Sequence, residues 1–313
     1  MDYANAYDKI SKLRQNLSSV IRGKTRIIDL SITALLSRGH LLIEDVPGVG
    51  KTTLAHSMAQ SINCTFQRIQ FTSDLLPSDV IGVTVYNQSA HTFEFRQGPI
   101  FANIVLADEI NRTTPKTQSA LLEAMNDRQV SIDKVTYKLP EPFMLLATQN
   151  PVEYSGTFPL PESQLDRFTM CITIGYPDIE DERDIIQSGS VTSITNLKPV
   201  ITGDELIEMQ RLVEGVKVEQ DIVTYMLSIA AMTRNHKGIR LGVSPRATKT
   251  LYRAAQARAM TQARDFCIPD DVKSLAPSVF GHRIIPEDRS AEDSVGSSET
   301  LMEDILSKIG VPV

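Results

Sequence analysis

The most constraining feature of this 313-residue sequence is a glycine-rich turn between an apolar run and a helix-forming segment. The turn, Glu-Asp-Val-Pro-Gly-Val-Gly-Lys-Thr, occupies residues 44–52, after a buried strand predicted at 40–43 and at the start of a helix predicted at 51–62. Gly48 and Gly50 allow backbone conformations that point successive N–H groups at one anion. The amino end of the helix adds partial positive charge. The segment therefore predicts a phosphate-binding loop.

The chemistry of a bound nucleotide gives the residues of this loop separate roles. Lys51 is expected to reach the β- and γ-phosphates, and the Thr52 hydroxyl is expected to bind Mg²⁺. Asp45 stands where the pattern G-x-x-x-x-G-K-[ST] has its first glycine, and aspartate tolerates unusual backbone angles better than most residues. We therefore expect Asp45 to affect the entry into the loop more than phosphate binding. The other candidate nucleotide-binding residues here are Pro47, Gly48, Val49, Gly50 and Thr53.

A second apolar run ends in two adjacent acids. Ile-Val-Leu-Ala at 104–107 reads as a buried strand and is followed by Asp108 and Glu109. Ligands of open α/β sheets bind at the carboxyl ends of the strands, so both carboxylates are expected beside the phosphate loop. Asp108 is expected to hold Mg²⁺ through water, and Glu109 to orient and polarise the attacking water. The pair therefore predicts hydrolysis rather than binding alone.

Three further polar residues are candidates for the same site. Asn150 follows a buried strand predicted at 143–147 and is placed to hydrogen-bond the γ-phosphate or the attacking water. Arg167 follows a short helix, and Arg246 lies in the first turn of a helix capped by Ser244. The helix dipole opposes a cation there, so we expect Arg246 to meet an anionic group. Each of the three also has a structural interpretation, as a turn residue or an ordinary ion-pair partner.

The order of apolar segments predicts two domains. Short apolar strands alternate with helices over residues 1–176, which predicts a parallel sheet covered by helices on both faces. Residues 83–98 and 130–139 alternate instead, as hairpin strands do. Residues 177–313 show helical periods only. The fold class predicted is an α/β core followed by a small all-α domain, with the polar segment 286–299 as an exposed loop.

The composition argues against several classes of protein. Net charge is −6 and the isoelectric point is about 5.5, without the basic excess that nucleic-acid binding usually requires. Three scattered cysteines argue against a disulfide framework or a zinc site and favour a reducing, cytoplasmic location. No stretch of about 18 apolar residues occurs, so no membrane span is expected.

Taken together and in order, these motifs resemble the AAA+ superfamily and, within it, the MoxR family. The resemblance covers roughly residues 5–310. The stretches that carry it are Val-Pro-Gly-Val-Gly-Lys-Thr (46–52), Gly-Pro-Ile-Phe-Ala (98–102), Leu-Ala-Asp-Glu-Ile-Asn-Arg (106–112), Lys-Thr-Gln-Ser-Ala-Leu-Leu-Glu-Ala-Met (116–125), Ala-Thr-Gln-Asn-Pro (147–151), Leu-Pro-Glu-Ser-Gln-Leu-Asp-Arg-Phe (160–168) and Ser-Pro-Arg-Ala (244–247).

The resemblance implies an AAA+ core with a helical lid, which binds ATP or ADP together with Mg²⁺. It makes Lys51 and Thr52 the Walker A residues, Asp108 and Glu109 the Walker B residues, and Asn150 sensor 1.

The resemblance also implies roles outside the Walker motifs. Arg167 looks like the finger that reaches the γ-phosphate of a neighbouring subunit, and Arg246 looks like sensor 2, from the lid. Ile21 lies in a segment similar to the one that lines the adenine pocket. Arg22, beside it, stands where a small or apolar residue is frequent.

Relatives assemble as hexameric rings with ATP between subunits, and they remodel protein clients, mature protein complexes or load metal cofactors. They commonly act with a protein that carries a von Willebrand factor A domain. Residues 83–98 and 128–139 look like hairpins that face the central pore of such rings. The leading interpretation is therefore an oligomeric, cytoplasmic ATPase that acts on proteins.

Two other classes of function compete with this interpretation. A helicase-like AAA+ motor shares the hairpin inserts, but the acidic isoelectric point argues against nucleic acid as its substrate. A non-catalytic, nucleotide-gated binding module would not need Glu109, Asn150 and Arg167 together. A GTPase is disfavoured because the sequence has no Asn-Lys-x-Asp motif.

Overall fold

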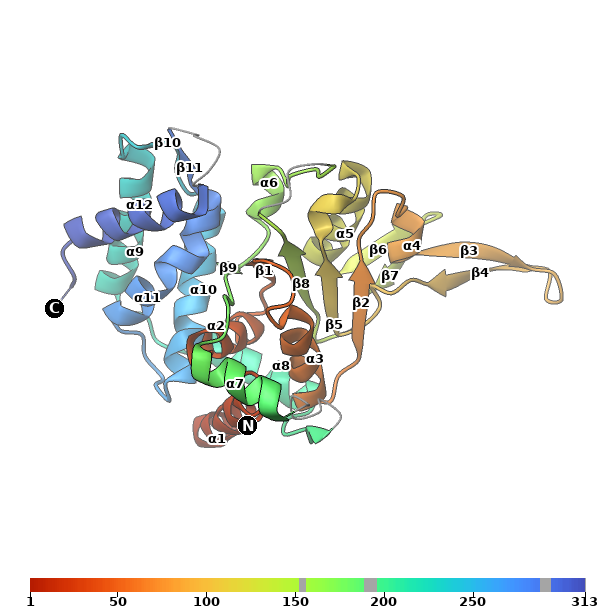
Figure 1. Cartoon of the computed structure of the whole chain (residues 1–313), viewed down its shortest axis with the longest axis horizontal. Coiled ribbons are helices and arrows are strands. Elements are labelled where there is room, and N and C mark those ends of the chain that lie inside the picture. The colour runs from red at the N-terminus through yellow and green to blue at the C-terminus, as the bar shows by residue number, and fades with distance from the viewer. Residues whose placement is uncertain (152–155, 189–195, 288–293, 313) are drawn as a thin grey trace.

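A parallel sheet forms the centre of the larger half of the protein (Figure 1). The computed structural model describes residues 1–151, 156–188, 196–287 and 294–312. Within them the sheet has five strands, all paired in parallel. In spatial order these are β2 (Phe66–Gln70), β5 (Ile104–Asp108), β8 (Met144–Gln149), β1 (Leu41–Glu44) and β9 (Met170–Ile172). The predicted α/β core is confirmed.

Helices cover both faces of this sheet, which explains why its central strands are apolar throughout. Leu41 and Ile43 on β1 belong to one buried cluster, together with α1 (Tyr3–Ser18), α2 (Thr25–Leu36) and α3 (Lys51–Ser61). Leu42 belongs to a second cluster, with α4 (Pro77–Ile81) and α5 (Pro115–Asp127). Successive side chains of a strand point to opposite faces, so a strand between two helical layers must be apolar at every position.

The first of these clusters continues into the helices of the carboxyl-terminal part. It includes Leu206 on α8 (Gly203–Glu214), Ile229 on α9 (Gln220–Asn235) and Leu251 on α10 (Pro245–Thr261). The Nε2 of Gln210 on α8 donates a hydrogen bond of 2.8 Å to the carbonyl of Leu35 on α2. The helices of this part are α7 (Ile179–Ser188), α8 (Gly203–Glu214), α9 (Gln220–Asn235), α10 (Pro245–Thr261), α11 (Pro269–Phe280) and α12 (Ser294–Lys308). The domain boundary between residues 176 and 177 stays a prediction.

Two expectations for the carboxyl-terminal part were wrong in detail. This part is not purely helical, because β10 (Ile239–Leu241) and β11 (Ile285–Pro286) pair in antiparallel fashion. Strands of three and two residues are too short to show an alternating pattern. Of the loop predicted at 286–299, residues 288–293 lie outside the described residues, whereas residues 294–299 form the first turns of α12.

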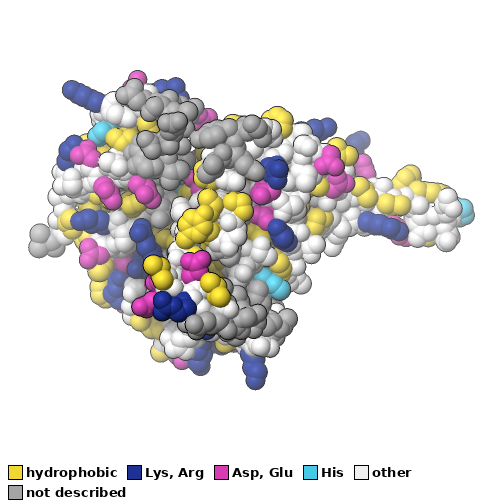
Figure 2. Space-filling model, in the orientation of Figure 1, with side chains coloured by type: hydrophobic (Ala, Val, Ile, Leu, Met, Phe, Trp, Pro, Cys, Tyr) yellow, Lys and Arg dark blue, Asp and Glu magenta, His cyan; other side chains and the backbone are white. Residues whose placement is uncertain are grey.

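Both predicted hairpins are present. The first consists of β3 (Gly82–Asn87) and β4 (Thr92–Gln97) and projects from the body as a long arm (Figure 1). The second consists of β6 (Gln129–Ile132) and β7 (Val135–Lys138). The rings of Phe95 and Tyr137 lie 4.2 Å apart between centroids, so the base of the arm packs on the second hairpin. Apolar side chains run along the exposed arm (Figure 2).

Candidate nucleotide site

The phosphate-loop candidate follows β1 at the carboxyl edge of the sheet. Gly48 and Gly50 have φ angles of 88° and 96°, a left-handed conformation that favours glycine. A Cβ added at either glycine would meet no heavy atom within 4 Å, so the loop borders open space. Lys51 begins α3, and its Nζ donates a hydrogen bond of 2.5 Å to the carbonyl of Asp45. Burial lowers the pKa of Lys51, and the carboxylates of Asp45, Asp108 and Glu109 oppose that shift.

Asp45, the departure from the glycine pattern, has a structural reason. Its carboxylate is buried, and Oδ2 accepts hydrogen bonds of 2.7 Å from the backbone N–H groups of Ile174 and Gly175. Oδ1 accepts a third from the N–H of Val46 at 2.8 Å. The side chain therefore ties the start of the loop to the segment that leaves β9 toward the carboxyl-terminal helices. A glycine could not make these bonds.

The two predicted acids lie at the same edge, held by a threonine from the adjacent strand. Asp108 ends β5, and its Oδ1 accepts a hydrogen bond of 2.6 Å from the Thr148 hydroxyl. The same Oγ1 accepts the N–H of Glu109 at 2.8 Å. Glu109 has φ 58° and ψ 49°, a left-handed conformation that is unusual for a side chain other than glycine and asparagine. Thr148 is fully buried, so one hydroxyl positions both acids.

Four polar side chains that sequence reasoning missed contact these acids. Nε and Nη2 of Arg68 donate to Oδ2 of Asp108, at 3.1 and 2.5 Å. Nε2 of Gln70 and Nη1 of Arg112 donate to Oε2 of Glu109, at 2.8 and 3.0 Å. The fourth is Thr148. The sequence could have indicated part of this arrangement. Arg68 and Gln70 are two residues apart on β2, and such side chains lie on the same face of the sheet.

Asn150 follows β8 directly, between the strand that carries the acids and the strand that leads into the loop. The N–H of Asp45 donates to the carbonyl of Gln149 at 3.1 Å, so the end of β8 lies against the start of the loop. The side chain of Asn150 is buried, with an exposed fraction of 8%. The structure therefore brings Lys51, Asp108, Glu109 and Asn150 to one edge of the sheet.

Arg167 and Arg246 lie elsewhere, at the opposite edge of the sheet. They line a cavity of about 280 Å³ together with His40 and Thr169, the residues that precede β1 and β9. The four residues of β1, at about 3.3 Å each, separate this amino edge from the phosphate loop by about 13 Å. We call this space the arginine cavity. Its arginines are Arg38, Arg128, Arg167, Arg246 and Arg253.

A half-buried carboxylate, that of Asp166, links the segments that carry the two predicted arginines. Asp166 accepts hydrogen bonds from the Ser244 hydroxyl at 3.1 Å and from Nε of Arg283 at 2.9 Å. Ser244 caps α10, the helix whose first turn carries Arg246, as predicted. Arg167 donates to the carbonyl of Leu122 at 2.7 Å, and Arg246 donates to Oδ1 of Asn126 at 2.5 Å. The partner expected for Arg246 was anionic, whereas the one observed is an amide.

The carboxyl-edge groups fit a magnesium nucleotide. Among the described residues no group of three or more His, Cys, Asp or Glu side chains is arranged to hold a metal ion. A cation beside Thr52 and Asp108 would therefore take most of its ligands from phosphate and water, which is the usual coordination of Mg²⁺. The open space at Gly48 and Gly50 leaves room for the phosphates.

Comparison with known proteins agrees with this geometry. The profile of the ATPase family associated with various cellular activities (AAA) matches residues 40–170, and the profile of the AAA lid domain matches residues 231–305. The chain is 38% identical to "Chaperone MoxR1" of Mycobacterium tuberculosis, over 94% of this chain and 80% of that protein. The chain belongs to the MoxR family of AAA+ ATPases.

Two other comparisons extend over nearly the whole chain. It is 48% identical to "Uncharacterized protein YeaC" of Bacillus subtilis, over 97% of this chain and 95% of that protein. A crystal structure of a candidate ATPase from Cytophaga hutchinsonii superposes with a TM-score of 0.91 at 36% identity, covering 99% of this chain and 97% of the other. The AAA+ core with a helical lid is thus shared with this solved structure.

Proposed function

We propose that this MoxR-family chain is a Mg²⁺-dependent ATPase whose active site is completed by a neighbouring subunit, and that it remodels protein clients. The observation that carries the proposal is the division of the predicted residues between two edges of the sheet. Lys51, Asp108 and Glu109 belong to the carboxyl edge, whereas Arg167 and Arg246 line the arginine cavity at the amino edge. A chain that cannot bring its arginines to its own phosphate loop can offer them to another copy.

At the carboxyl edge, different residues would bind the phosphates and Mg²⁺. The backbone around Gly48 and Gly50 would bind the phosphates, with Lys51 supplying positive charge to the β- and γ-phosphates. The Thr52 hydroxyl would bind Mg²⁺ directly, and Asp108 would bind it through water. When bound, Mg²⁺ would neutralise the charge that develops on the phosphates.

The acid beside the magnesium position would act on water. Glu109 would accept a proton from the attacking water, and Thr148 holds its backbone for this purpose. Asn150 would orient the water or the γ-phosphate. Ile21 is the proposed contact to adenine, because it packs beside the apolar cluster at the end of α1.

From the amino edge of the next subunit, Arg167 would stabilise the charge of the γ-phosphate in the transition state, as arginine fingers do. Arg246 would contact the same phosphate, because Asp166 fixes the start of its helix beside Arg167. A closed assembly in which every subunit has both neighbours satisfies this requirement at all sites. We propose a hexameric ring.

The β3–β4 arm supports action on a protein client. The side chain of Phe93 is 74% exposed and that of Tyr86 is 47% exposed, and their ring centroids lie 5.1 Å apart. An aromatic pair on a projecting hairpin is suited to grip apolar segments of a polypeptide. One relative is named a chaperone. We further propose a cytoplasmic location and a partner with a von Willebrand factor A domain. None of the described helices can span a membrane.

The test is ATP turnover per subunit, measured against protein concentration with Mg²⁺ present. Specific activity should rise with concentration, because association completes each site. Arg167→Ala should lower turnover by roughly 1,000-fold or more, the contribution of arginine fingers in other NTPases. Mixing Arg167→Ala with Glu109→Gln should restore activity, since each variant supplies the half that the other lacks. Failure to restore activity at any ratio would refute a shared site.

A further inference from the structure

The proposed function uses only part of the charge in the arginine cavity. Besides Arg167 and Arg246, the side chains of Arg38, Arg128 and Arg253 line the same space of about 280 Å³. They come from three elements, since Arg38 follows α2, Arg128 follows α5 and Arg253 lies on α10. Cations that repel one another gather in a cavity only where something else holds them or an anion is bound there.

At two of these arginines the backbone is strained in a way that glycine would not be. Arg38 and Arg128 have φ angles of 56° and 54°, in the left-handed region, at the carboxyl ends of α2 and α5. Glycine is the usual residue at such helix ends, because every other L-residue is strained there. The chain nonetheless places an arginine at both positions, and both face the same cavity.

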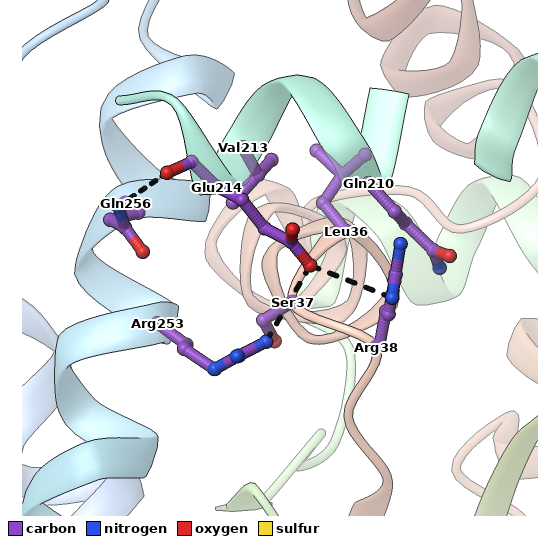
Figure 3. Close-up of a pocket in the computed structure, with 8 residues that line it drawn as sticks. All are labelled: Leu36, Ser37, Arg38, Gln210, Val213, Glu214, Arg253 and Gln256. Atoms are coloured by element: carbon purple, nitrogen blue, oxygen red, sulfur yellow. Dashed lines mark hydrogen bonds and ion pairs between the residues drawn. The ribbon is translucent and has the colours of Figure 1, made fainter. Parts of the chain in front are cut away.

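The acids beside the cavity do not balance this charge. Asp166 is bonded to Arg283 at 2.9 Å. Glu214 lies between Arg38 and Arg253, with Oε1 at 3.5 and 3.8 Å from their nitrogens (Figure 3). These distances are longer than good charge-assisted hydrogen bonds, and half of the Glu214 side chain is exposed to water. Such a pair is weak and easily exchanged for a better anion.

Burial is the first cause of a lowered pKa at two groups beside the cavity, and neighbouring arginines lower both further. Burial, and then the charge of Arg128, lower the pKa of His40 to about 3, so His40 is neutral and adds no charge. Burial lowers the pKa of Arg128, and Arg38 lowers it further. Glu141 opposes this shift by less than Arg38 contributes. Since five arginines line the cavity and Glu214 lies 3.5 and 3.8 Å from two of them, the cavity is suited to an anion.

We propose that Arg38 and Arg128 are further phosphate-binding residues for the nucleotide of the adjacent subunit, and that Glu214 holds Arg38 until this nucleotide arrives. The inference rests on the proposed function of Arg167 and Arg246, which brings a triphosphate to this edge. A planar guanidinium binds phosphate oxygens in a bidentate manner, and several such groups suit a compact polyanion.

The chemistry of the facing edge favours phosphate over carboxylate as the anion. Four acids lie at the carboxyl ends of β1 and β5. Burial raises the pKa of Glu44 and so disfavours its charged form, and Asp45 is bonded to the backbone N–H groups of Ile174 and Gly175. The other two acids are Asp108 and Glu109. Each already has an arginine partner in its own chain, Arg68 at 2.5 Å and Arg112 at 3.0 Å. The charge left for the arginine cavity of the next subunit is therefore that of the nucleotide.

The experiment uses Arg38→Gly and Arg128→Gly in the full-length chain. Glycine relieves the left-handed backbone while removing the charge, so the melting temperature should hold or rise. The matched control is Ala263→Gly, because Ala263 has φ 56° at the end of α10 but no charge. Arg38→Lys keeps the charge. If a glycine variant folds poorly, asparagine replaces glycine, since it also accepts left-handed angles.

Each glycine variant should lower kcat/KM for ATP by about 10-fold or more, the scale of a lost charge-assisted hydrogen bond. Binding of a fluorescent ATP analogue to dilute, dissociated subunits should stay unchanged. Mixing with Glu109→Gln should restore turnover, and Arg38→Lys should recover much of it. Unchanged kcat/KM would overturn the inference, and so would an equal loss with Ala263→Gly. Weakened self-association without nucleotide would overturn it too, by identifying a protein carboxylate as the anion.

The outcome also separates this inference from the proposed function. Suppose that Glu109→Gln restores the activity of Arg167→Ala while both glycine variants keep full activity. This result would support the shared active site and refute phosphate binding by Arg38 and Arg128. If Arg167→Ala is not rescued, the shared site itself falls.

Discussion

Replacing Asp45 by alanine should destabilise the protein, because its carboxylate accepts hydrogen bonds from backbone N–H groups, one of which is buried. Ile174 is buried, and its N–H donates to Oδ2 of Asp45 at 2.7 Å, as does the N–H of Gly175. A buried donor left without a partner costs about 1–3 kcal/mol, and Gly175 is only half-buried, so Asp45→Ala should lower the free energy of unfolding by about 2–4 kcal/mol. Asp45→Gly, which restores the usual loop residue, should lose as much.

Urea unfolding followed by circular dichroism measures this loss, and thermal melting should show a decrease of about 3–6 °C, because the entropy of unfolding of a chain of 313 residues is large. Asp45→Asn keeps one acceptor oxygen, so its loss should be less than half that of alanine. Asp8→Ala is the control, because Asp8 forms only an exposed pair with Lys12, and such a change should cost below about 0.5 kcal/mol. A loss for Asp45→Ala as small as that of the control would refute the reasoning.

Three further changes test the site and the fold. Glu109→Gln should keep ATP binding while turnover falls by roughly 100-fold or more, the scale of a lost general base, and unchanged turnover would remove Glu109 from the mechanism. Thr148→Val, which keeps shape but removes bonds to Asp108 and Glu109, should lower turnover at least about 10-fold with ATP binding intact; wild-type turnover would show that the hydroxyl is dispensable. His40 has a folded pKa of about 3, below its ordinary value of 6.5, so its contribution to stability is complete above pH 6.5 and is lost as pH falls toward 3. His40→Asn should therefore reduce the loss of stability between pH 7 and 5 by about 2 kcal/mol in urea titrations, and equal losses in both proteins would contradict this assignment.

Local patterns predicted the sheet and most helices well, because burial on both faces leaves a continuous apolar signature. Residues 104–107 and 143–147 are such runs, and both became central strands. The turn at Asp133 and Lys134 was also visible, and both residues take the positive φ angles that a tight hairpin requires. The start of α12 was missed because Ser294, Gly296 and their neighbours are weak helix formers.

The site was predictable to the extent that chain order fixes which edge of a parallel sheet a residue occupies. Residues that follow strands, such as Asp108 and Asn150, had to meet at the carboxyl edge. Arg246 could not be located in this way, because its position depends on how α10 packs against distant elements and on the bond from Ser244 to Asp166. Arg68 could not be ranked above any other exposed strand residue without knowing that β2 lies next to β5.

The unbroken apolar cluster that joins the sheet to α8, α9 and α10 has a mechanical consequence. Close-packed interiors resist shear, and Gln210 and the bridge from Lys9 to Glu205 add polar ties across the same junction. In the proposed ring, a subunit built in this way should rotate as a rigid body when the nucleotide state of its neighbour changes. The β3–β4 arm packs on the body at its base and projects from it. A small rotation of the body would then produce a larger displacement at Phe93, because Phe93 lies far along the arm.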